Sequence, residues 1–313
     1  MKNFVLNIII FFISFMAFSV LLPLLIAIST QFTPIIEKYT FGHIPNWGDA
    51  YERSIDYQNW INSNNRPKGL ILGSSTAYRN INTQILSNET NINWFNLGSS
   101  AQTPRVSLIL LKDLLSKIEP EYLIYDVYSV LVDNPGHESA YDLISNSALP
   151  LNVKFQLFQI NPNFNLFQKL IYRYFQLNLS SKIYRFHRDD NGIYLTGGST
   201  YSPKPHSTFI SVKNVVMNPL KLNNELKKII SSCRENHIKF ILNISPIINI
   251  VNNNTIKDVD LIINDELNNK VDLFYDDHHM HGEGSIEYSK ILAKKIIASN
   301  YISTSNSKSK TIH

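Results

Sequence analysis

The chain has a single cysteine, Cys233, among 313 residues, so no internal disulfide can form and a zinc site built from several thiolates is excluded. Charged residues are also sparse, at 17% of the chain, and the formal net charge is only +4. No basic stripe with interleaved aromatic residues is present, which argues against nucleic-acid binding. Glycine and proline are too few for a low-complexity chain, and 44% of the residues are hydrophobic. The composition therefore predicts a folded protein with a sizeable core.

One long run without any charge stands at the N-terminus, where residues 4–28 read FVLNIIIFFISFMAFSVLLPLLIAI. About 20 apolar residues suffice to cross a bilayer, whereas the apolar core of a signal peptide has about 7–15. Lys2 precedes the run and places the N-terminus in the cytoplasm by the positive-inside rule. We expect a membrane anchor over residues 1–30 and a soluble domain on the extracytoplasmic side. Cleavage after the small residues at 27–29 is the alternative.

Beyond the anchor, short apolar runs alternate with amphipathic stretches. This alternation predicts an α/β fold with a parallel sheet covered by helices on both faces. The runs that predict buried strands are residues 69–72, 93–97, 122–127, 239–245 and 271–274. Those that predict helices are residues 106–118, 223–236 and 285–299.

The rest of the chain divides around this predicted α/β domain, which spans residues 68–300. Residues 31–67 contain three prolines and are expected to connect the anchor to the domain, and the polar residues 301–313 form a tail. Residues 138–190 are rich in aromatic side chains at helical spacing and predict an inserted helical region. Its aromatic side chains could form a satellite hydrophobic core, a cap over the active site, or a face against the bilayer. A loop is expected over residues 189–205.

Two adjacent hydroxyls end the first predicted strand, in the stretch LILGSSTAYRN. Ligands of open α/β sheets bind at the carboxyl ends of the strands, where Ser74 and Ser75 would lie. A serine hydroxyl is a poor nucleophile until a base takes its proton. Such a base is available in DDHHMHGEGS, where Asp276 precedes His279 by three residues. A carboxylate can hold one ring nitrogen of a histidine and leave the other free as a base.

A third strand end, in FNLGSSAQTP, offers Gly98. Because glycine has no side chain, its backbone N–H can approach a developing oxyanion closely. The three stretches together point to acyl transfer on an activated serine.

These three blocks, in this order and spacing, resemble the SGNH (GDSL-like) hydrolase superfamily. The resemblance covers about residues 68–300, interrupted by the inserted region. It implies a flavodoxin-like three-layer α/β/α fold with no cofactor and no metal. It also implies that Ser75 is the nucleophile, His279 the base and Asp276 the acid that orients it, with the N–H groups of Ser75 and Gly98 in the oxyanion hole.

One block of the family is missing here. Many members carry a Gly-x-Asn-Asp block after the middle strand, whose asparagine is a further oxyanion donor, and this sequence has YDVYSVLVDNPG instead. Asn134 is the nearest asparagine, but it lies well beyond the predicted strand end, so the role is not transferred to it.

Several residues have competing interpretations. Ser75 could be a helix N-cap, Gly98 a simple tight turn, and Arg79 the partner of a surface acid rather than of substrate. Ser74 is the nucleophile if the turn is offset by one residue, and Asp277 competes with Asp276. A metal site is the remaining alternative, with His278 and His281 joining His279 and the aspartates as ligands.

We therefore expect an esterase or O-acyltransferase acting on an acylated extracytoplasmic glycan or another envelope polymer. Besides the membrane and the ester substrate, a membrane protein that donates acyl groups is a further expected partner. The alternative from another class is a non-catalytic envelope protein that kept the fold and binds glycan. A metal-dependent hydrolase is the third alternative.

Overall fold

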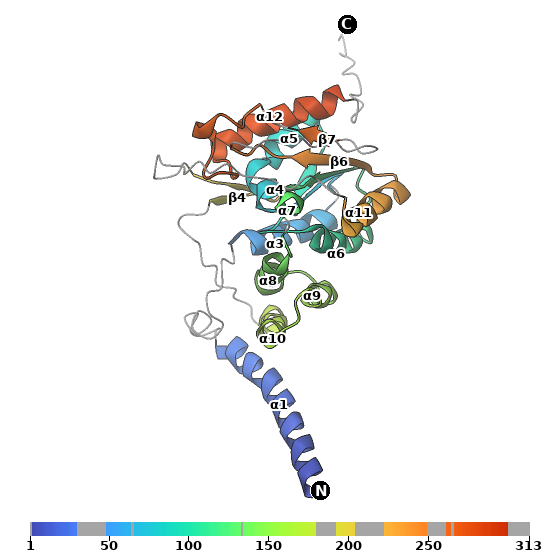
Figure 1. Cartoon of the computed structure of the whole chain (residues 1–313), viewed down its shortest axis with the longest axis vertical. Helices are drawn as coiled ribbons and strands as arrows, with labels where there is room; N and C mark the ends of the chain where they lie inside the picture. Colours follow the sequence, from blue (N-terminus) through green and yellow to red (C-terminus); the bar gives the residue numbers. More distant parts are fainter. Residues whose placement is uncertain are drawn as a thin grey trace.

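The computed structural model describes residues 2–29, 48–63, 66–132, 134–179, 192–203, 222–248, 261–263 and 266–299. The first part of the predicted connecting segment and the predicted polar tail lie outside these ranges. The chain is a mixed α/β protein with a parallel sheet, an inserted group of helices and one N-terminal apolar helix (Figure 1).

The sheet has the strand order β2-β1-β3-β6-β7, and every pairing in it is parallel. Leu70 of β1 pairs with Phe95 of β2 on one side and with Leu123 of β3 on the other. All residues of β1, β2 and β3 are buried, as expected of strands covered on both faces. The strands are β1 (Gly69–Leu72), β2 (Trp94–Asn96), β3 (Tyr122–Asp126), β6 (Lys239–Ile244) and β7 (Leu261–Ile263).

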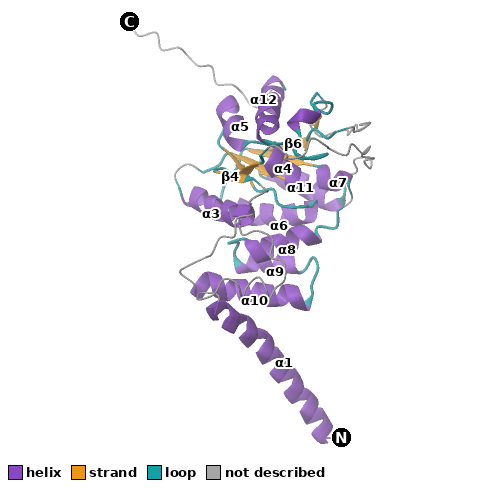
Figure 2. Ribbon diagram, turned by 90° about the vertical axis from the view of Figure 1, so that its left-hand side faces the viewer, coloured by secondary structure: helices purple, strands orange, loops and turns teal. Residues whose placement is uncertain are grey.

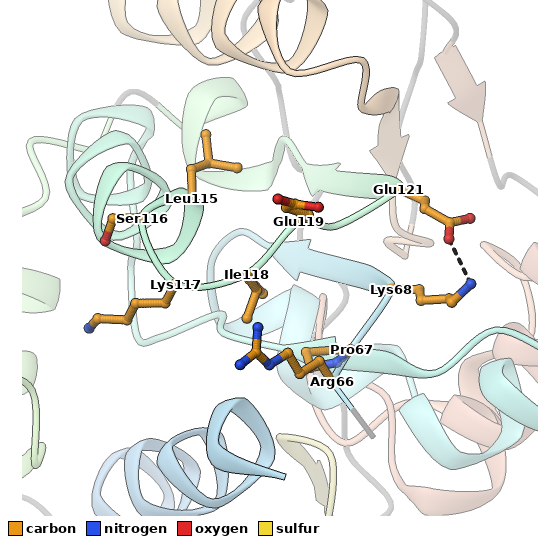
Figure 3. Close-up of a pocket in the computed structure, with 9 residues that line it drawn as sticks. All are labelled: Arg66, Pro67, Lys68, Leu115, Ser116, Lys117, Ile118, Glu119 and Glu121. Atoms are coloured by element: carbon orange, nitrogen blue, oxygen red, sulfur yellow. Dashed lines mark hydrogen bonds and ion pairs between the residues drawn. The ribbon is translucent and has the colours of Figure 1, made fainter. Parts of the chain in front are cut away.

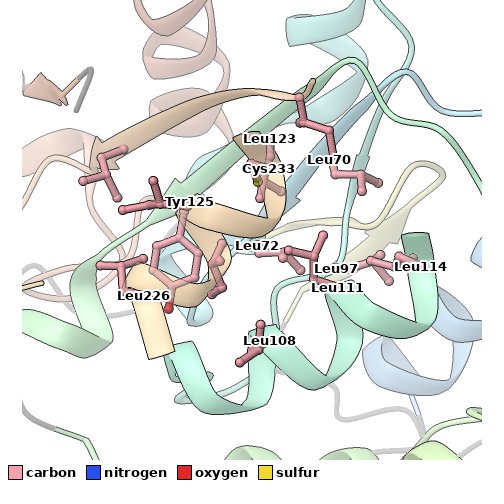
Figure 4. Packing of buried hydrophobic residues seen from close by; sticks show 14 of the residues in the cluster. Leu70, Leu72, Leu97, Leu108, Leu111, Leu114, Leu123, Tyr125, Leu226 and Cys233 are labelled. Atoms are coloured by element: carbon pink, nitrogen blue, oxygen red, sulfur yellow. The ribbon is translucent and has the colours of Figure 1, made fainter. Parts of the chain in front are cut away.

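Helices cover both faces, and each face has its own core. The leucine-rich core includes Leu70, Leu72 and Leu123 from the strands and Leu111 from α6 (Figure 4). The helices over this face are α3 (Gly48–Asn62), α6 (Pro104–Leu115) and α11 (Asn224–Glu235). The other face packs against α4 (Ser75–Asn80), α5 (Thr83–Thr90) and α12 (Gly282–Ala298). The predicted helices at 106–118, 223–236 and 285–299 are thus confirmed as α6, α11 and α12.

Four of the five predicted strands are confirmed, and the fifth prediction was wrong. Residues 271–274 were expected to be a strand, but Val271–Leu273 form a 3₁₀ turn and Phe274 makes only an isolated bridge to Met280. Leu273 and Phe274 are buried beneath α12, so a short buried turn has the same apolar pattern as a strand. The last position in the sheet is taken by β7.

Two further segments are more ordered than expected. The second part of the predicted connecting segment contains the 15-residue helix α3, which begins at Gly48, after Pro45, and ends before Pro67. The predicted loop at 189–205 contains an antiparallel hairpin of β4 (Ile193–Leu195) and β5 (Ser199–Tyr201). The N–H of Asn96 in the edge strand β2 donates to Gly197 O at 2.8 Å, so the turn of the hairpin covers part of this sheet edge.

The inserted region is helical, as predicted. After the short helix α7 (Tyr128–Leu131) it consists of α8 (His137–Asn146), α9 (Leu151–Phe158) and α10 (Phe164–Leu179), and its last residues, 180–190, lie outside the described ranges. Leu143, Leu157 and Leu170 belong to a separate buried cluster that rests on Val106 and Leu110 of α6. The insertion therefore has a satellite core, but this core is mainly aliphatic, and Phe155, Phe164 and Tyr174 are exposed instead of buried in it.

The N-terminal helix α1 (Lys2–Ser29) is long and apolar enough to cross a membrane by length and composition. A signal sequence near the N-terminus can meet the same criteria of length and composition. Its last turns pack on α10, where Ile26 and Ala27 bury Tyr172 (Figure 2).

Candidate functional site

A tight turn at the end of β1 presents Ser75. Gly73 has a φ of +146°, and a Cβ there would lie 2.8 Å from both Cβ and the carbonyl oxygen of Asp126. Only glycine therefore lets the turn pass so close to β3. The next serine, Ser74, is 1% exposed, and its hydroxyl lies 3.0 Å from that of Thr76. Ser75 is the first residue of α4 and is partly exposed.

Ser75, His279 and Asp276 form one hydrogen-bonded chain. The distance between Ser75 Oγ and His279 Nε2 is 2.7 Å, and the distance between His279 Nδ1 and Asp276 Oδ2 is also 2.7 Å. The other carboxylate oxygen of Asp276 accepts the backbone N–H groups of His279 at 2.7 Å and of His278 at 3.0 Å. This is the geometry of a nucleophile, a base and the acid that orients the base. The fold thus brings together three residues that sequence analysis singled out, although 204 positions of the chain separate Ser75 from His279.

Asn80, which sequence analysis did not single out, fastens the histidine loop to the serine helix. It is fully buried at the end of α4. Its Nδ2 donates to His278 O at 2.9 Å, and its Oδ1 accepts the N–H of Met280 at 2.8 Å. These two bonds clamp the backbone on both sides of His279. The only signal in the sequence is a polar residue at the end of a short helix, which is too general to identify such a role.

The electrostatics of the pair favour a neutral histidine and a charged aspartate. Burial lowers the pKa of the His279 imidazole to about 4, against the opposing effect of its hydrogen bond with Asp276. Burial acts to raise the pKa of Asp276, but the hydrogen bond and charge of His279 outweigh it and hold this pKa well below its usual range. At neutral pH, His279 is therefore able to accept a proton and Asp276 is ionised.

A second buried carboxylate, Asp126, joins the carboxyl ends of β1, β3 and β6. It is fully buried, and it accepts hydrogen bonds from Thr76 Oγ1 at 2.5 Å, Ser245 Oγ at 2.5 Å and Asn243 Nδ2 at 3.0 Å. Burial raises the pKa of Asp126, and these donors oppose the rise. The network holds the turn that carries Ser75, because Thr76 is the residue after it. Asp126 and Asn243 lie within the predicted strands, where their apolar neighbours concealed them.

Gly98 differs from the expectation for an oxyanion donor. Its N–H donates to the side-chain oxygen of Asn96 at 2.9 Å, so it is already engaged. A Cβ at Gly98 would lie 3.0 Å from Cβ of Ala77 and 3.1 Å from the carbonyl oxygen of Gly73. The glycine therefore allows this loop to pack against the serine turn. An oxyanion would have to replace the side chain of Asn96 as the acceptor.

A cavity of about 330 Å³ opens beside Ser75 and His279. Asn134 lines it, although sequence analysis assigned this residue no role because of its distance from the strand. The Oδ1 of Asn134 accepts the N–H of Gly136 at 2.8 Å, which fixes the orientation of the side-chain amide. The other lining residues are Ser74, Ser100, Ala101, Tyr128, Ser129, Val132, Glu138 and His278.

The competing candidates have other partners. Asp277 contacts Nδ1 of His278, whose ring stacks on Tyr128 at 4.7 Å, so this aspartate serves the neighbouring histidine. His281 caps α12, because its Nδ1 accepts the N–H of Glu283 at 3.2 Å. Arg79 donates to the hydroxyl of Ser202 at 3.0 Å.

Asp276, His278 and His279 also form a possible metal cluster, since one ligand atom of each lies within 4.8 Å of the others. Both ring nitrogens of His279 are already engaged by Asp276 and Ser75. A metal ion on either nitrogen would therefore displace one of these partners. The arrangement fits a hydrogen-bonded triad better than a coordination shell.

A larger depression of about 470 Å³ lies elsewhere, beside the amino ends of β1 and β3 (Figure 3). An ion pair between Lys68 Nζ and Glu121 Oε1, 2.7 Å apart, lies at its edge. Its lining has no histidine or cysteine and no nucleophile beside a base. Ligands of such sheets bind at the opposite, carboxyl ends of the strands, where Ser75 lies.

In comparisons with known proteins, no family model matches the chain and no curated protein sequence is significantly similar to it.

Proposed function

We propose that this protein is a membrane-anchored serine hydrolase or O-acyltransferase of the SGNH type. The observation that carries the proposal is the hydrogen-bonded chain from Ser75 through His279 to Asp276. Two features support the fold assignment. The strand order corresponds to the flavodoxin-like order 2-1-3-4-5, and the three residues gather at the carboxyl ends of the strands.

The proposed reaction has two half-reactions. The Oγ of Ser75 attacks the acyl carbon of an ester while His279 Nε2 takes the hydroxyl proton. The tetrahedral intermediate collapses, His279 returns the proton to the leaving alcohol, and an acyl group remains on Ser75. Water or a sugar hydroxyl then attacks this acyl-enzyme, with His279 again accepting the proton. Water gives a free acid, a sugar gives a new ester, and both restore the Ser75 hydroxyl.

The oxyanion needs at least two hydrogen-bond donors. As the first residue of α4, Ser75 has an N–H with no acceptor inside its helix, and this N–H is the first donor that we propose. Gly98 can be the second donor after it releases Asn96. The Nδ2 group of Asn134 is the third candidate, because its Oδ1 is held by Gly136 and the residue lines the cavity.

Asn134→Asp tests this third donor. Aspartate keeps the oxygen that accepts the N–H of Gly136 but replaces the donating amide with a second acceptor. We expect kcat to fall by about 10²–10³-fold with a much smaller change in KM. An unchanged kcat would assign the role to Gly98. Asn236→Asp on the far end of α11 is the matched control and should leave both constants unchanged.

The cavity favours a small acyl group. Its volume of about 330 Å³ is at the lower end of ligand sites, and it contains the hydroxyl of Ser100 and the carboxylate of Glu138, 2.6 Å apart. These groups suit the hydroxyls of a carbohydrate. Together with α1 as an anchor, they favour a short O-acyl group on an extracytoplasmic glycan or related envelope polymer, with a membrane protein as a possible source of acyl groups.

A non-catalytic glycan-binding protein is the second candidate, and the hydrogen bond of the Gly98 N–H to Asn96 favours it. A binder, however, has no need of a neutral histidine placed 2.7 Å from a serine hydroxyl.

Hydrolysis of 4-nitrophenyl acetate by the full chain in detergent, with and without a chelator, separates these alternatives. We expect turnover that resists chelation, is lost in Ser75→Ala and persists in the control Ser231→Ala, which changes an exposed serine of α11. Turnover that is lost on chelation would support the metal-dependent alternative. An inactive but folded protein that binds acylated glycan would support the binder. Adding a sugar acceptor then distinguishes transfer from hydrolysis.

The pH profile follows from the buried base. Protonated His279 cannot take the proton of Ser75, so kcat/KM falls as the pH drops through the pKa of His279 in the free enzyme. Because this pKa is lowered to about 4, we expect the acid limb near pH 4 and full activity from pH 6 upward. An acid limb near pH 6.5, the ordinary range for histidine, would contradict the environment described for His279.

A further inference from the structure

The exposed surface of α9 and α10, called the α9–α10 surface below, has an unusual composition. From residue 147 to residue 179 the chain contains three charged side chains, Lys154, Lys169 and Arg173. All three are buried, with exposures of 2%, 2% and 1%. Within the described residues, α9 and α10 therefore expose no charge. By contrast, α12 at the opposite end of the domain exposes Glu283 and Lys290 (Figure 1).

Large apolar side chains take the place of charges on this surface. Leu151 and Phe155 of α9 are 45% and 53% exposed, and Phe164 and Tyr174 of α10 are 47% and 42% exposed. Outside α1, these three aromatic side chains are the only exposed ones among the described residues. Amide side chains such as Asn152, Gln156 and Asn165 are exposed beside them. Exposed aromatic side chains on helices that expose no charge are typical of an interaction site.

The buried cations have a different task. Lys154 Nζ donates to the carbonyl oxygens of Ile144 at 3.0 Å and Ser147 at 2.6 Å, and Arg173 donates to that of Ser145. They satisfy carbonyl groups at the C-terminal end of α8, where positive charge is favourable. The charges of α9 and α10 are therefore directed into the domain and away from this surface.

The surface continues directly into the apolar helix α1. The ring of Phe164 stacks on that of Phe15, with centroids 5.3 Å apart, while Tyr172 of α10 packs on Ile26. In both ribbon views α10 lies at the end of the domain from which α1 projects (Figures 1 and 2). Residues 4–18 of α1 are exposed and, apart from Asn7 and Ser14, apolar, so the two surfaces form one continuous region.

The contact of Phe164 with Phe15 allows the depth of α10 in the bilayer to be estimated. From Lys2 to Phe15 an α-helix rises about 20 Å, whereas the hydrocarbon core of a bilayer is about 30 Å thick. If Lys2 lies at one boundary, Phe164 lies inside the hydrocarbon, near the opposite boundary. Aromatic and amide side chains without charge suit a helix embedded about 5–10 Å into such an interface.

We propose that the α9–α10 surface is a second membrane contact, which embeds the inserted helices in the outer lipid leaflet beside α1. The inference rests on the proposed role of α1 as an anchor and is independent of the chemistry at Ser75. With this contact, the soluble domain rests directly on the lipid surface and is not held away from it by the anchor alone. A substrate of this enzyme would then be met at the membrane surface.

Lipid contact can be measured with an environment-sensitive fluorophore on single introduced cysteines, using the full chain in phosphatidylcholine vesicles with and without brominated acyl chains. The native cysteine does not interfere, because Cys233 is buried and burial raises the pKa of its thiol to about 12. Phe155→Cys and Tyr174→Cys report on the surface. Phe11→Cys in α1 is the positive control and Lys290→Cys in α12 the negative control. Circular dichroism verifies that each variant is folded.

We expect brominated lipid to quench the labels at positions 155 and 174, less strongly than the more deeply placed label at position 11, and to leave position 290 unchanged. Quenching at position 11 without quenching at 155 and 174 would overturn the membrane contact while keeping the anchor. In that case self-quenching that grows with protein density would identify a second copy as the occupant. Absence of quenching at position 11 as well would overturn both the anchor and the inference, and would leave the proposed chemistry untouched.

Discussion

Ser75→Ala and His279→Ala are each expected to lower kcat by about 10⁴–10⁶-fold, and the double variant should lose no more than either single one. The reason is that the two side chains act as a unit. Without Ser75 the imidazole has no proton to remove, and without His279 the hydroxyl at 2.7 Å is not activated. Steady-state hydrolysis of an aryl acetate by the three variants measures this non-additivity.

Losses that multiply in the double variant would mean that Ser75 and His279 act independently, which the triad excludes. Ser74→Ala provides a further comparison, because Ser74 is buried and lies beside Thr76 rather than His279. A complete loss of activity in Ser74→Ala together with a small loss in Ser75→Ala would identify Ser74 as the nucleophile. Unfolding by urea verifies that each variant keeps its stability.

Asp276→Asn is expected to lower kcat by about 10⁴-fold without unfolding the protein. The amide keeps one oxygen to accept the N–H groups of His278 and His279. Its NH₂ group, however, faces Nδ1 of His279 in place of the carboxylate oxygen, and so it favours the tautomer whose Nε2 carries the proton. That tautomer cannot deprotonate Ser75.

Asp277→Asn is the matched control, since this neighbouring carboxylate contacts His278 instead. We expect it to retain most of the activity. Equal losses in the two variants would indicate that negative charge near the cavity matters, rather than the orientation of His279.

The strand ends were the most predictable part of this protein. Buried parallel strands are short uninterrupted apolar runs, and the residues that follow them must lie together at one edge of the sheet. This reasoning placed Ser75 correctly after β1. It also led us to pair Ser75 with Asp276 and His279, 204 positions separating the serine from the base, although the segment before these two residues is a 3₁₀ turn and not a strand.

Residues whose role depends on side-chain direction could not be predicted. Asn134 was set aside because it follows β3 at a distance, but the chain folds back through α7 and brings it into the cavity. The sequence predicts that the N–H of Gly98 faces an oxyanion, whereas in the structure this N–H donates to the side-chain oxygen of Asn96. The periodicity of apolar residues in a sequence indicates which positions are buried, but it does not indicate which polar atoms form hydrogen bonds with each other.

The insertion shows a related limit. Its aromatic residues predicted helices with apolar faces, but the sequence alone does not separate a core from an exposed surface. Leu157 and Leu170 belong to the core, while Phe155 and Tyr174 are exposed. The buried Lys154 and Arg173 have no counterpart in the apolar pattern, because their partners are carbonyl groups at the end of α8.

The central claim is that Ser75 is activated by His279, and covalent labelling tests it most directly. The full chain in detergent is treated with a fluorophosphonate, and the modified peptide is located by mass spectrometry in the wild type, His279→Ala and Asp277→Asn. The account predicts modification at Ser75 in the wild type and in Asp277→Asn, and none in His279→Ala. Folded wild-type protein that stays unmodified, or modification of Ser75 that persists without His279, would contradict it.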